Sequence, residues 1–312
     1  MNILPIIQPL LIRRTVIDGS VKSIKSALSQ AAKSGTEDKD GMVSEDVASI
    51  VQALQNLDSQ GASDLMSSLS DEGLLDFLAE LISDENLGLN KAEKGIFFNN
   101  LASKVNVGYL LAEVSNAFAK LDSKSGGIDD VEALAKAIAQ HASSHTKIDY
   151  IAAIAPQATD KNSYTELSLF GGARVYFGDA EAFAIAHIFT SLNGHSSAVT
   201  DTLKLLSVEQ LKAVMLAGID MKQYFLNVVG PTAMLNTSLA SKVLSVASGS
   251  DDTQLKATLF EVGAQMLDYV KHHTGDSFSF MVIGKSAAAE ELTHGLTAVS
   301  YTHLTLPTTP YV

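Results

Sequence analysis

The sequence predicts a mainly α protein, a compact multi-helix array with one small β-hairpin near residues 164–177. Three observations predict this fold class. Apolar residues recur at helical spacing, helix-capping residues precede several of these stretches, and one short stretch instead gathers aromatic and branched residues around a Gly-Gly pair. With 312 residues, 46% of them hydrophobic and 18% charged, the chain can bury a sizeable core.

Four stretches carry the clearest helical stripes. In chain order, their apolar residues are Val43, Val47, Ile50, Val51, Leu54 and Leu57; then Leu74, Leu75, Leu78, Leu81 and Ile82; then Leu110, Leu111, Val114, Phe118 and Leu121; and last Leu255, Leu259, Val262, Met266, Leu267 and Val270. Each set lies on one face of a helix. Such a face can be buried only against other helices, so the stripes predict a packed helical array.

Helix starts can also be read from the sequence. Ser207 stands three residues before Gln210, the spacing of a capping box in which two otherwise unpaired amides are satisfied. Asp251 and Gln254 have the same spacing. Ser70 precedes the stripe that begins at Leu74 and is expected to cap that helix.

One stretch departs from the helical pattern. Residues 164–179, YTELSLFGGARVYFGD, contain two short runs on either side of Gly171-Gly172. A Gly-Gly pair permits the positive φ angles of a two-residue hairpin turn, so we predict a β-hairpin over 164–177. The alternative is an irregular loop with a buried aromatic plug.

The loop APQATDKNS divides the chain near residue 158. We expect a leader segment at 1–19, a first helical half at 20–157, a second helical half with the hairpin at 158–299, and a non-native tail at 300–312. The leader places its arginines after its apolar run, which argues against a cleaved secretory signal.

Composition excludes several classes of function. A net charge of −13 disfavours binding to nucleic acid, and the absence of cysteine removes disulfides and zinc–thiolate sites. No stretch of 18 apolar residues exists, so no membrane span is expected. The sequence does not determine the cellular location of the protein, and it is compatible with secretion without a cleaved signal peptide.

The C-terminal string SYTHLTLPT resembles translated sequencing-adapter read-through. A natural tail is the alternative. If the string is an artefact, the native chain continues past residue 299 and a C-terminal domain is missing here.

A series of segments in the body follows one order: FFNNLASKV, VSNAFAKLDSKSG, EALAKAIAQHAS, KIDYIAAIAPQATD, GDAEAFAIAHIFTSLNG and LKAVMLAGI. Over about residues 90–280 this series resembles a helical region of large, uncharacterised bacterial secreted proteins of the toxin or effector type. The resemblance implies a scaffold or delivery role ahead of a variable C-terminal effector domain. It implies no catalytic residues.

Residues 35–46, GTEDKDGMVSED, raise the possibility of a calcium loop. With Gly41 at the sixth loop position, three residues fall at ligand positions: Asp38, Asp40 and Ser44. Val47, however, stands at position 12, where a bidentate glutamate is wanted. The alternative is an acidic turn whose carboxylates favour the start of the next helix. A second candidate, residues 122–132, is one residue short and places Lys124 at a ligand position.

The other candidate groups favour structural roles. His141 and His145 would share a face only on a continuous helix, and Ser144 predicts that the helix ends between them. His187 lies in an apolar helix and is expected to pack in the core. The carboxylates of Asp129 and Asp130 are interpreted as helix-start residues rather than as a catalytic pair.

No catalytic residue and no cofactor other than possible calcium are therefore predicted. The leading hypothesis is a non-catalytic helical scaffold or delivery module of a larger bacterial secreted protein, with a protein partner or the missing domain as its partner. The first alternative is a stand-alone helical protein-interaction module, which a broad exposed apolar patch would favour. The second is an enzyme with an unrecognised site, which a pocket holding groups with shifted pKa values would favour.

Overall fold

The computed structural model describes residues 51–84, 88–121, 127–159, 164–168, 172–176, 178–224, 232–250, 252–273 and 281–283, together with residues 22, 24, 26, 28, 29 and 32. The chain divides into two compact units, the first ending at Ala153 and the second beginning at Ile154. The division that the sequence predicts between residues 157 and 158 stays a prediction. The predicted leader and tail lie outside the described residues.

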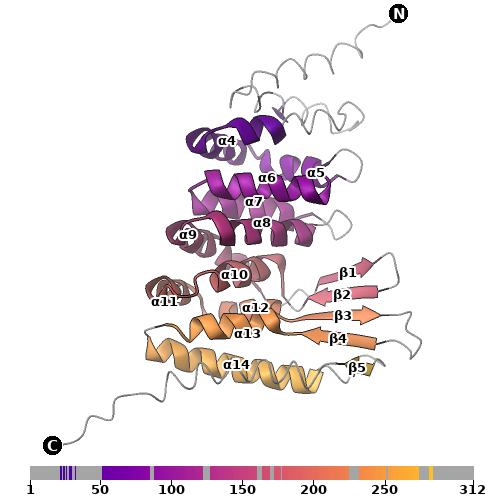
Figure 1. Cartoon of the computed structure of the whole chain (residues 1–312), viewed down its shortest axis with the longest axis vertical. Helices are drawn as coiled ribbons and strands as arrows, with labels where there is room; N and C mark the ends of the chain where they lie inside the picture. The colour runs from indigo at the N-terminus through magenta and orange to yellow at the C-terminus, as the bar shows by residue number, and fades with distance from the viewer. Residues whose placement is uncertain are drawn as a thin grey trace, which may run out of the picture. The chain divides into compact units, whose positions relative to one another are not determined.

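The described helices of the first unit are α4 (Ser59–Asp71), α5 (Leu75–Ser83), α6 (Lys91–Lys104), α7 (Gly108–Ala119), α8 (Gly127–His141) and α9 (Ser144–Ile154), whose last residue belongs to the second unit. Helix α6 packs against α8 and α4, while α7 packs against α5, α8 and α4 (Figure 1). Helices that alternate in the chain are thus neighbours, and each buries one apolar face against the next.

Aromatic rings fill the core of the first unit. Phe98 meets Phe97 and Phe118 edge to face, with ring centroids 5.4 and 5.2 Å apart. The fully buried Tyr150 donates its hydroxyl proton to Ser115 Oγ at 2.8 Å, which satisfies a polar group that would be costly to bury alone. These contacts join α6, α7 and α9 into one core.

Helices α7 and α9 approach closely because residue 108 is glycine. A Cβ atom at Gly108 would contact the carbonyl oxygen of Thr146 and would lie 2.5 Å from the Tyr150 nitrogen and 2.6 Å from Asp149 Cβ. No real Cβ tolerates such distances. The glycine therefore sets the separation of these two helices.

The predicted stripes agree with the observed burial where the structure describes them. All five apolar residues of the stripe over 74–82 are buried. In the stripe over 110–121, Leu121 alone is half-buried, and the rest are buried. In the last stripe, Leu259 and Val262 are buried and Leu255 is half-buried.

The described helices of the second unit are η3 (Ala155–Gln157), α10 (Ala180–Thr190), α11 (Ser196–Leu205), α12 (Val208–Ala217), α13 (Ser238–Ala247) and α14 (Thr253–His273). Helix α10 is apolar on nearly all sides and packs against α12 and α13. Helix α14 covers α12, and α11 covers α13. A helix apolar all round belongs in the interior, which is where α10 lies.

Five strands of the second unit form one sheet in the order β1-β2-β3-β4-β5 (Figure 1). They are β1 (Tyr164–Ser168), β2 (Gly172–Tyr176), β3 (Asp220–Tyr224), β4 (Thr232–Asn236) and β5 (Met281–Ile283). Neighbours pair antiparallel except β4 and β5, which are parallel. A parallel pair needs a long crossover, and α13 and α14 supply it.

The predicted fold class, a helical array with one small hairpin, is therefore wrong. Strands β1 and β2 pair within the predicted range, but they are two of the five strands of a sheet. The proposed Gly-Gly turn is also wrong, because Gly172 pairs with Ser168 inside the ladder and three residues separate the strands. Local periodicity missed the sheet because its other strands lie far along the chain and are only three to five residues long.

Two of the expected helix starts need correction. The Ser207–Gln210 capping box is confirmed, with both reciprocal bonds present. Ser70 is wrong as a cap, because it lies inside α4 and donates to Glu113 Oε2 at 2.5 Å. At the start of α14, Asp252 accepts hydrogen bonds from the Gln254 and Leu255 amides and so caps this helix. The sequence assigned that role to Asp251, which lies outside the described residues.

Candidate functional site

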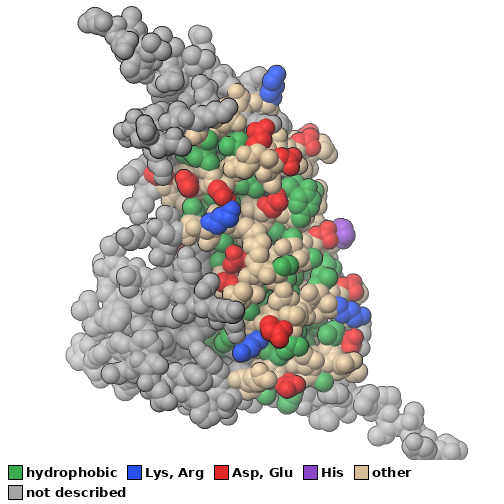
Figure 2. All heavy atoms as spheres, turned by 180° about the vertical axis from the view of Figure 1, so that it is seen from behind, with side chains coloured by type: hydrophobic (Ala, Val, Ile, Leu, Met, Phe, Trp, Pro, Cys, Tyr) green, Lys and Arg blue, Asp and Glu red, His purple; other side chains and the backbone are tan. Residues whose placement is uncertain are grey.

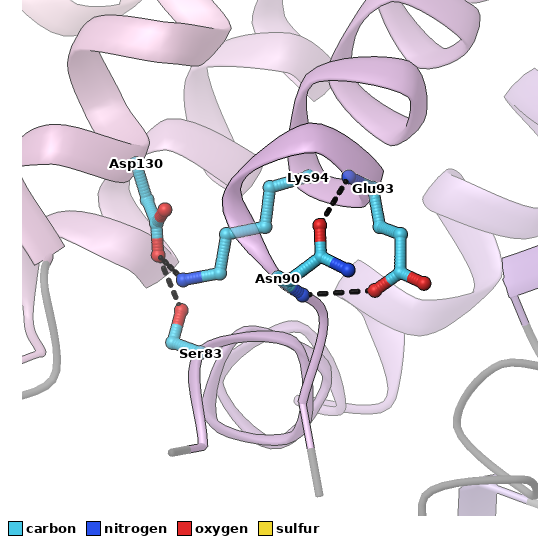
Figure 3. A network of polar contacts seen from close by, with 5 residues as sticks. All are labelled: Ser83, Asn90, Glu93, Lys94 and Asp130. Atoms are coloured by element: carbon cyan, nitrogen blue, oxygen red, sulfur yellow. Dashed lines mark hydrogen bonds and ion pairs between the residues drawn. The ribbon is translucent and has the colours of Figure 1, made fainter.

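A buried polar network joins three helices of the first unit (Figure 3). Asp130 in the first turn of α8 accepts a hydrogen bond from Ser83 Oγ at 2.6 Å and an ion pair from Lys94 Nζ at 2.8 Å, both at Oδ2. Ser83 is the last residue of α5, and Lys94 lies in the first turn of α6. Asp130 is 4% exposed and Ser83 is 5% exposed. One carboxylate therefore links the ends of three helices.

The start of α6 holds Lys94 in place. Asn90 Oδ1 accepts from the Ala92 and Glu93 amides at 3.0 and 3.1 Å, and Glu93 Oε2 accepts from the Asn90 amide at 2.9 Å. This complete capping box, seen beside the network in Figure 3, fixes the first helical turn. Lys94 follows directly, so its ammonium group is directed at Asp130 from an ordered backbone.

Burial raises the pKa of Asp130 above its ordinary value of 3.8. The hydrogen bonds from Lys94 and Ser83 act in the opposite direction, and the neighbouring Asp129 adds to the rise. The close Lys94 contact would by itself suggest a lowered pKa. Burial outweighs that contact and raises the pKa, because the carboxylate is almost wholly removed from water.

The network is suited to structure rather than to chemistry. A nucleophilic serine needs a base to take its proton and an open path to a substrate. Ser83 instead donates to a carboxylate that is already paired with Lys94, and it is buried. The arrangement fixes helix ends in register.

A second buried carboxylate lies at the start of α10 in the second unit. Asp179 Oδ1 accepts from the Ala182 amide at 2.8 Å, and Oδ2 accepts from the amide and hydroxyl of Thr159 at 2.5 and 2.9 Å. Burial raises the pKa of Asp179, and these hydrogen bonds oppose the rise. Burial also raises the pKa of the nearby Glu181, with a smaller contribution from Asp179.

The hydrogen bonds of Asp179 join the two ends of the segment that contains β1 and β2. Residue 159 comes before β1 and residue 179 comes after β2, so the bonds to Thr159 tie together the two chain segments that lead into and out of this strand pair. Asp179 thus caps α10 and also links the chain segments on either side of the β1–β2 pair.

The calcium candidates Asp38, Asp40 and Ser44 lie outside the described residues, and calcium binding there stays a prediction. In the second candidate, Asp129, Asp130 and Glu132 belong to α8, and Asp130 is occupied by Lys94. Asp129 and Asp130 stand in the first turn of that helix, as the helix-start interpretation requires.

The histidines occupy positions that fit structural roles. The predicted break between His141 and His145 is confirmed, because α8 ends at His141 and α9 begins at Ser144. Both side chains are exposed, and His145 Nε2 lies 3.3 Å from Asp149 Oδ2. His187 is half-buried and stacks edge to face on Phe183, with ring centroids 4.6 Å apart.

Sequence reasoning missed both buried carboxylate sites. The partners of Asp130 lie 36 and 47 residues away, so no local motif joins them. Asp179 gave a usable signal, because an aspartate directly before an apolar run is a standard helix-start pattern.

The described residues contain no group of three histidine, aspartate or glutamate side chains placed to hold a metal ion. None of the helices in that part of the chain has both the length and the apolar character needed to cross a bilayer. Compared with protein-family models, with curated proteins and with solved structures, the chain matches none of them.

Proposed function

We propose that the chain is a non-catalytic helical scaffold that presents or delivers an attached effector domain of a bacterial secreted protein. The observation that carries the proposal is that the buried carboxylates are hydrogen-bonded by groups of the same chain. Asp130 and Asp179 are the kind of buried acid that marks many active sites. Both are instead occupied by donors of this chain: Asp130 joins the ends of three helices, and Asp179 caps the start of α10. The resemblance over residues 90–280 supports the same role.

The surface also supports a scaffold. On the face seen in Figure 2, acidic, basic and apolar side chains of the described residues are interspersed over the helices. The net charge of −13 keeps such a surface solvated. A mixed surface over packed helices is compatible with a scaffold.

The test begins with long-read sequencing of the source gene on both sides of this reading frame. The expected result is an open frame that continues past codon 299 into a further domain. The full gene is then expressed with Lys94→Met, which disrupts the buried network, and with the matched exposed variant Lys120→Met.

A scaffold or delivery role predicts that Lys94→Met lowers the amount of the attached domain in the culture medium while its activity in lysate is retained. Lys120→Met, which changes an exposed ion pair with Asp76, is expected to leave export unchanged. Equal export of both variants and wild type, or a native gene that ends at this frame, would contradict the proposal.

The second candidate function is a stand-alone protein-interaction module. It is favoured by large apolar side chains that are 43–52% exposed on helices and at helix ends: Ile96, Tyr109, Leu205, Val208 and Phe260. Photo-crosslinking residues introduced singly at Tyr109 and at Val208 test it in the source cells. One discrete crosslinked partner at either position supports this function, and diffuse crosslinking at both argues against it.

A further inference from the structure

Among the described strands, β1 lies at one edge of the sheet. Strand β1 pairs with β2 along all five of its residues, and within the described ranges no strand lies on its other side. Within the described part of the chain, the opposite edge is β5, whose three residues pair with Thr232, Ala233 and Met234 of β4. Strand β1 therefore offers the longer and more regular edge.

The backbone of such an edge can bind another strand. In an antiparallel pair, alternate residues use their N–H and C=O groups toward the partner strand, and the others direct them outward. Every second residue of β1 thus has its backbone groups on the side away from β2. An extended peptide that pairs with these groups would add a sixth strand to the sheet.

Charge indicates which peptide would fit. Glu166 is the central residue of β1, and the register places it opposite Arg174 of β2, which is in turn opposite Lys222 of β3. An added strand would place its own central residue opposite Glu166 on the free side. Oppositely charged cross-strand neighbours are favourable and like charges are unfavourable, so that residue should be a cation.

Two further observations agree with a cationic partner. The chain carries a net charge of −13, which attracts basic segments over longer distances. A second copy of the chain that paired antiparallel with β1 about its centre would set Glu166 against Glu166, and this disfavours the copy as occupant.

We propose that the outer edge of β1 binds an extended peptide segment that carries a lysine or arginine opposite Glu166. This binding goes beyond the scaffold function and does not depend on it. The hydrogen bonds between Thr159 and Asp179 join the segment before β1 to the segment after β2. They limit the conformational freedom of the β1–β2 pair before a peptide binds. Preorganisation of this kind lowers the cost of binding.

The test uses the full chain and a fluorescein-labelled seven-residue probe of alternating threonine and valine with lysine at its centre. Fluorescence anisotropy measures its affinity, and a probe with a central glutamate is the control. Two further lysine probes carry N-methyl groups on alternate residues, in the two possible phases. One phase removes the donors that face β1 and the other leaves them intact.

We expect the lysine probe to bind more tightly than the glutamate probe, and only one N-methyl phase to bind. Glu166→Lys should reverse the preference, by about fivefold for each probe, which is the size of one cross-strand charge pair. Glu166→Gln should remove the preference. Asp76→Lys in the first unit changes the net charge by the same amount and should leave the preference in place.

Three results would overturn the proposal. The first is equal binding of the two N-methyl phases, which would exclude strand pairing. The second is an equal effect of Asp76→Lys and Glu166→Lys, which would show that net charge alone attracts the probe. The third is self-association of the wild-type chain in sedimentation that Glu166→Gln strengthens by removing the Glu166–Glu166 repulsion, which would make a second copy the occupant.

Discussion

Replacing either member of the buried ion pair should have unequal effects, and the difference can be worked from the structure. Among the described residues, Lys94→Met leaves the buried carboxylate of Asp130 with the Ser83 hydroxyl as its hydrogen-bond donor. Stranding a buried charge in this way costs about 3–5 kcal/mol of unfolding free energy. Asp130→Asn removes the charge and leaves Lys94, whose side chain is 16% exposed and can turn toward water. That change should cost about 1–2 kcal/mol.

The two variants should also respond to pH in opposite ways. The pKa of Asp130 is raised above 3.8 in the folded state, so its contribution to stability is fully present below pH 3.8 and is lost as the pH rises through the folded value. Asp130→Asn removes this titration, so its deficit relative to wild type should shrink as the pH rises. Removing the Lys94 cation raises the folded pKa of Asp130 further. The Lys94→Met deficit should therefore be small in acid and grow toward neutral pH.

Urea unfolding followed by helical circular dichroism measures these differences, and the chain has no tryptophan to follow instead. The titration runs from about pH 3.5 to about pH 7.5, which covers the expected window. Lys120→Met is the matched control, because its ion pair with Asp76 has the same 2.8 Å distance but side chains that are 63% and 53% exposed. It should cost less than about 1 kcal/mol.

The reasoning fails if Asp130→Asn costs more than Lys94→Met at neutral pH. It also fails if the Asp130→Asn deficit grows as the pH rises. Either result would mean that pairing with Lys94, rather than burial, determines the pKa of Asp130, and that the folded value lies below 3.8.

Three further predictions concern packing, hydrogen bonding and calcium. Gly108→Ala should lower the unfolding free energy by about 1–3 kcal/mol through overpacking, whereas Gly95→Ala, with open space around the new Cβ, should raise it by about 0.5–1 kcal/mol; urea unfolding compares them. Tyr150→Phe should cost about 1–2 kcal/mol and lower the Tm, because the buried Ser115 hydroxyl loses its partner. If the 36–46 loop binds calcium, millimolar Ca²⁺ should raise the Tm relative to chelator, and identical melting curves would end that hypothesis.

Local features could be predicted from the sequence with some success. The stripe over residues 74–82 and the Ser207–Gln210 capping box are confirmed, because each depends on residues within a few positions of one another. Ser70 shows the limit of this reasoning. It resembles a cap for the next helix, yet α4 continues through it, and the contact that decides its role is with Glu113, 43 residues away.

The sheet could not be predicted because its pairings are not local. Strand β3, DMKQY, has neither the branched composition nor a clear alternation that marks a strand. Its pairing with β2, whose residues lie 44 to 52 positions earlier in the chain, determines its conformation, and tertiary context overrides a weak local preference. The prediction of a helical array relied on local apolar periodicity, which carries no information about strand pairing between distant segments.

Helical periodicity alone distinguishes Asp130 from its neighbour Asp129, a difference that the sequence prediction did not use. The interpretation of Asp129 and Asp130 as one acidic pair treats adjacent residues as equivalent, but neighbours on a helix point about 100° apart. Asp129 is exposed, whereas Asp130 shares the buried stripe of Leu134 and Ile138, four and eight residues further on. A carboxylate on an apolar stripe must find a cation or donors from another helix. The spacing thus required a partner such as Lys94, although only the fold could say which one.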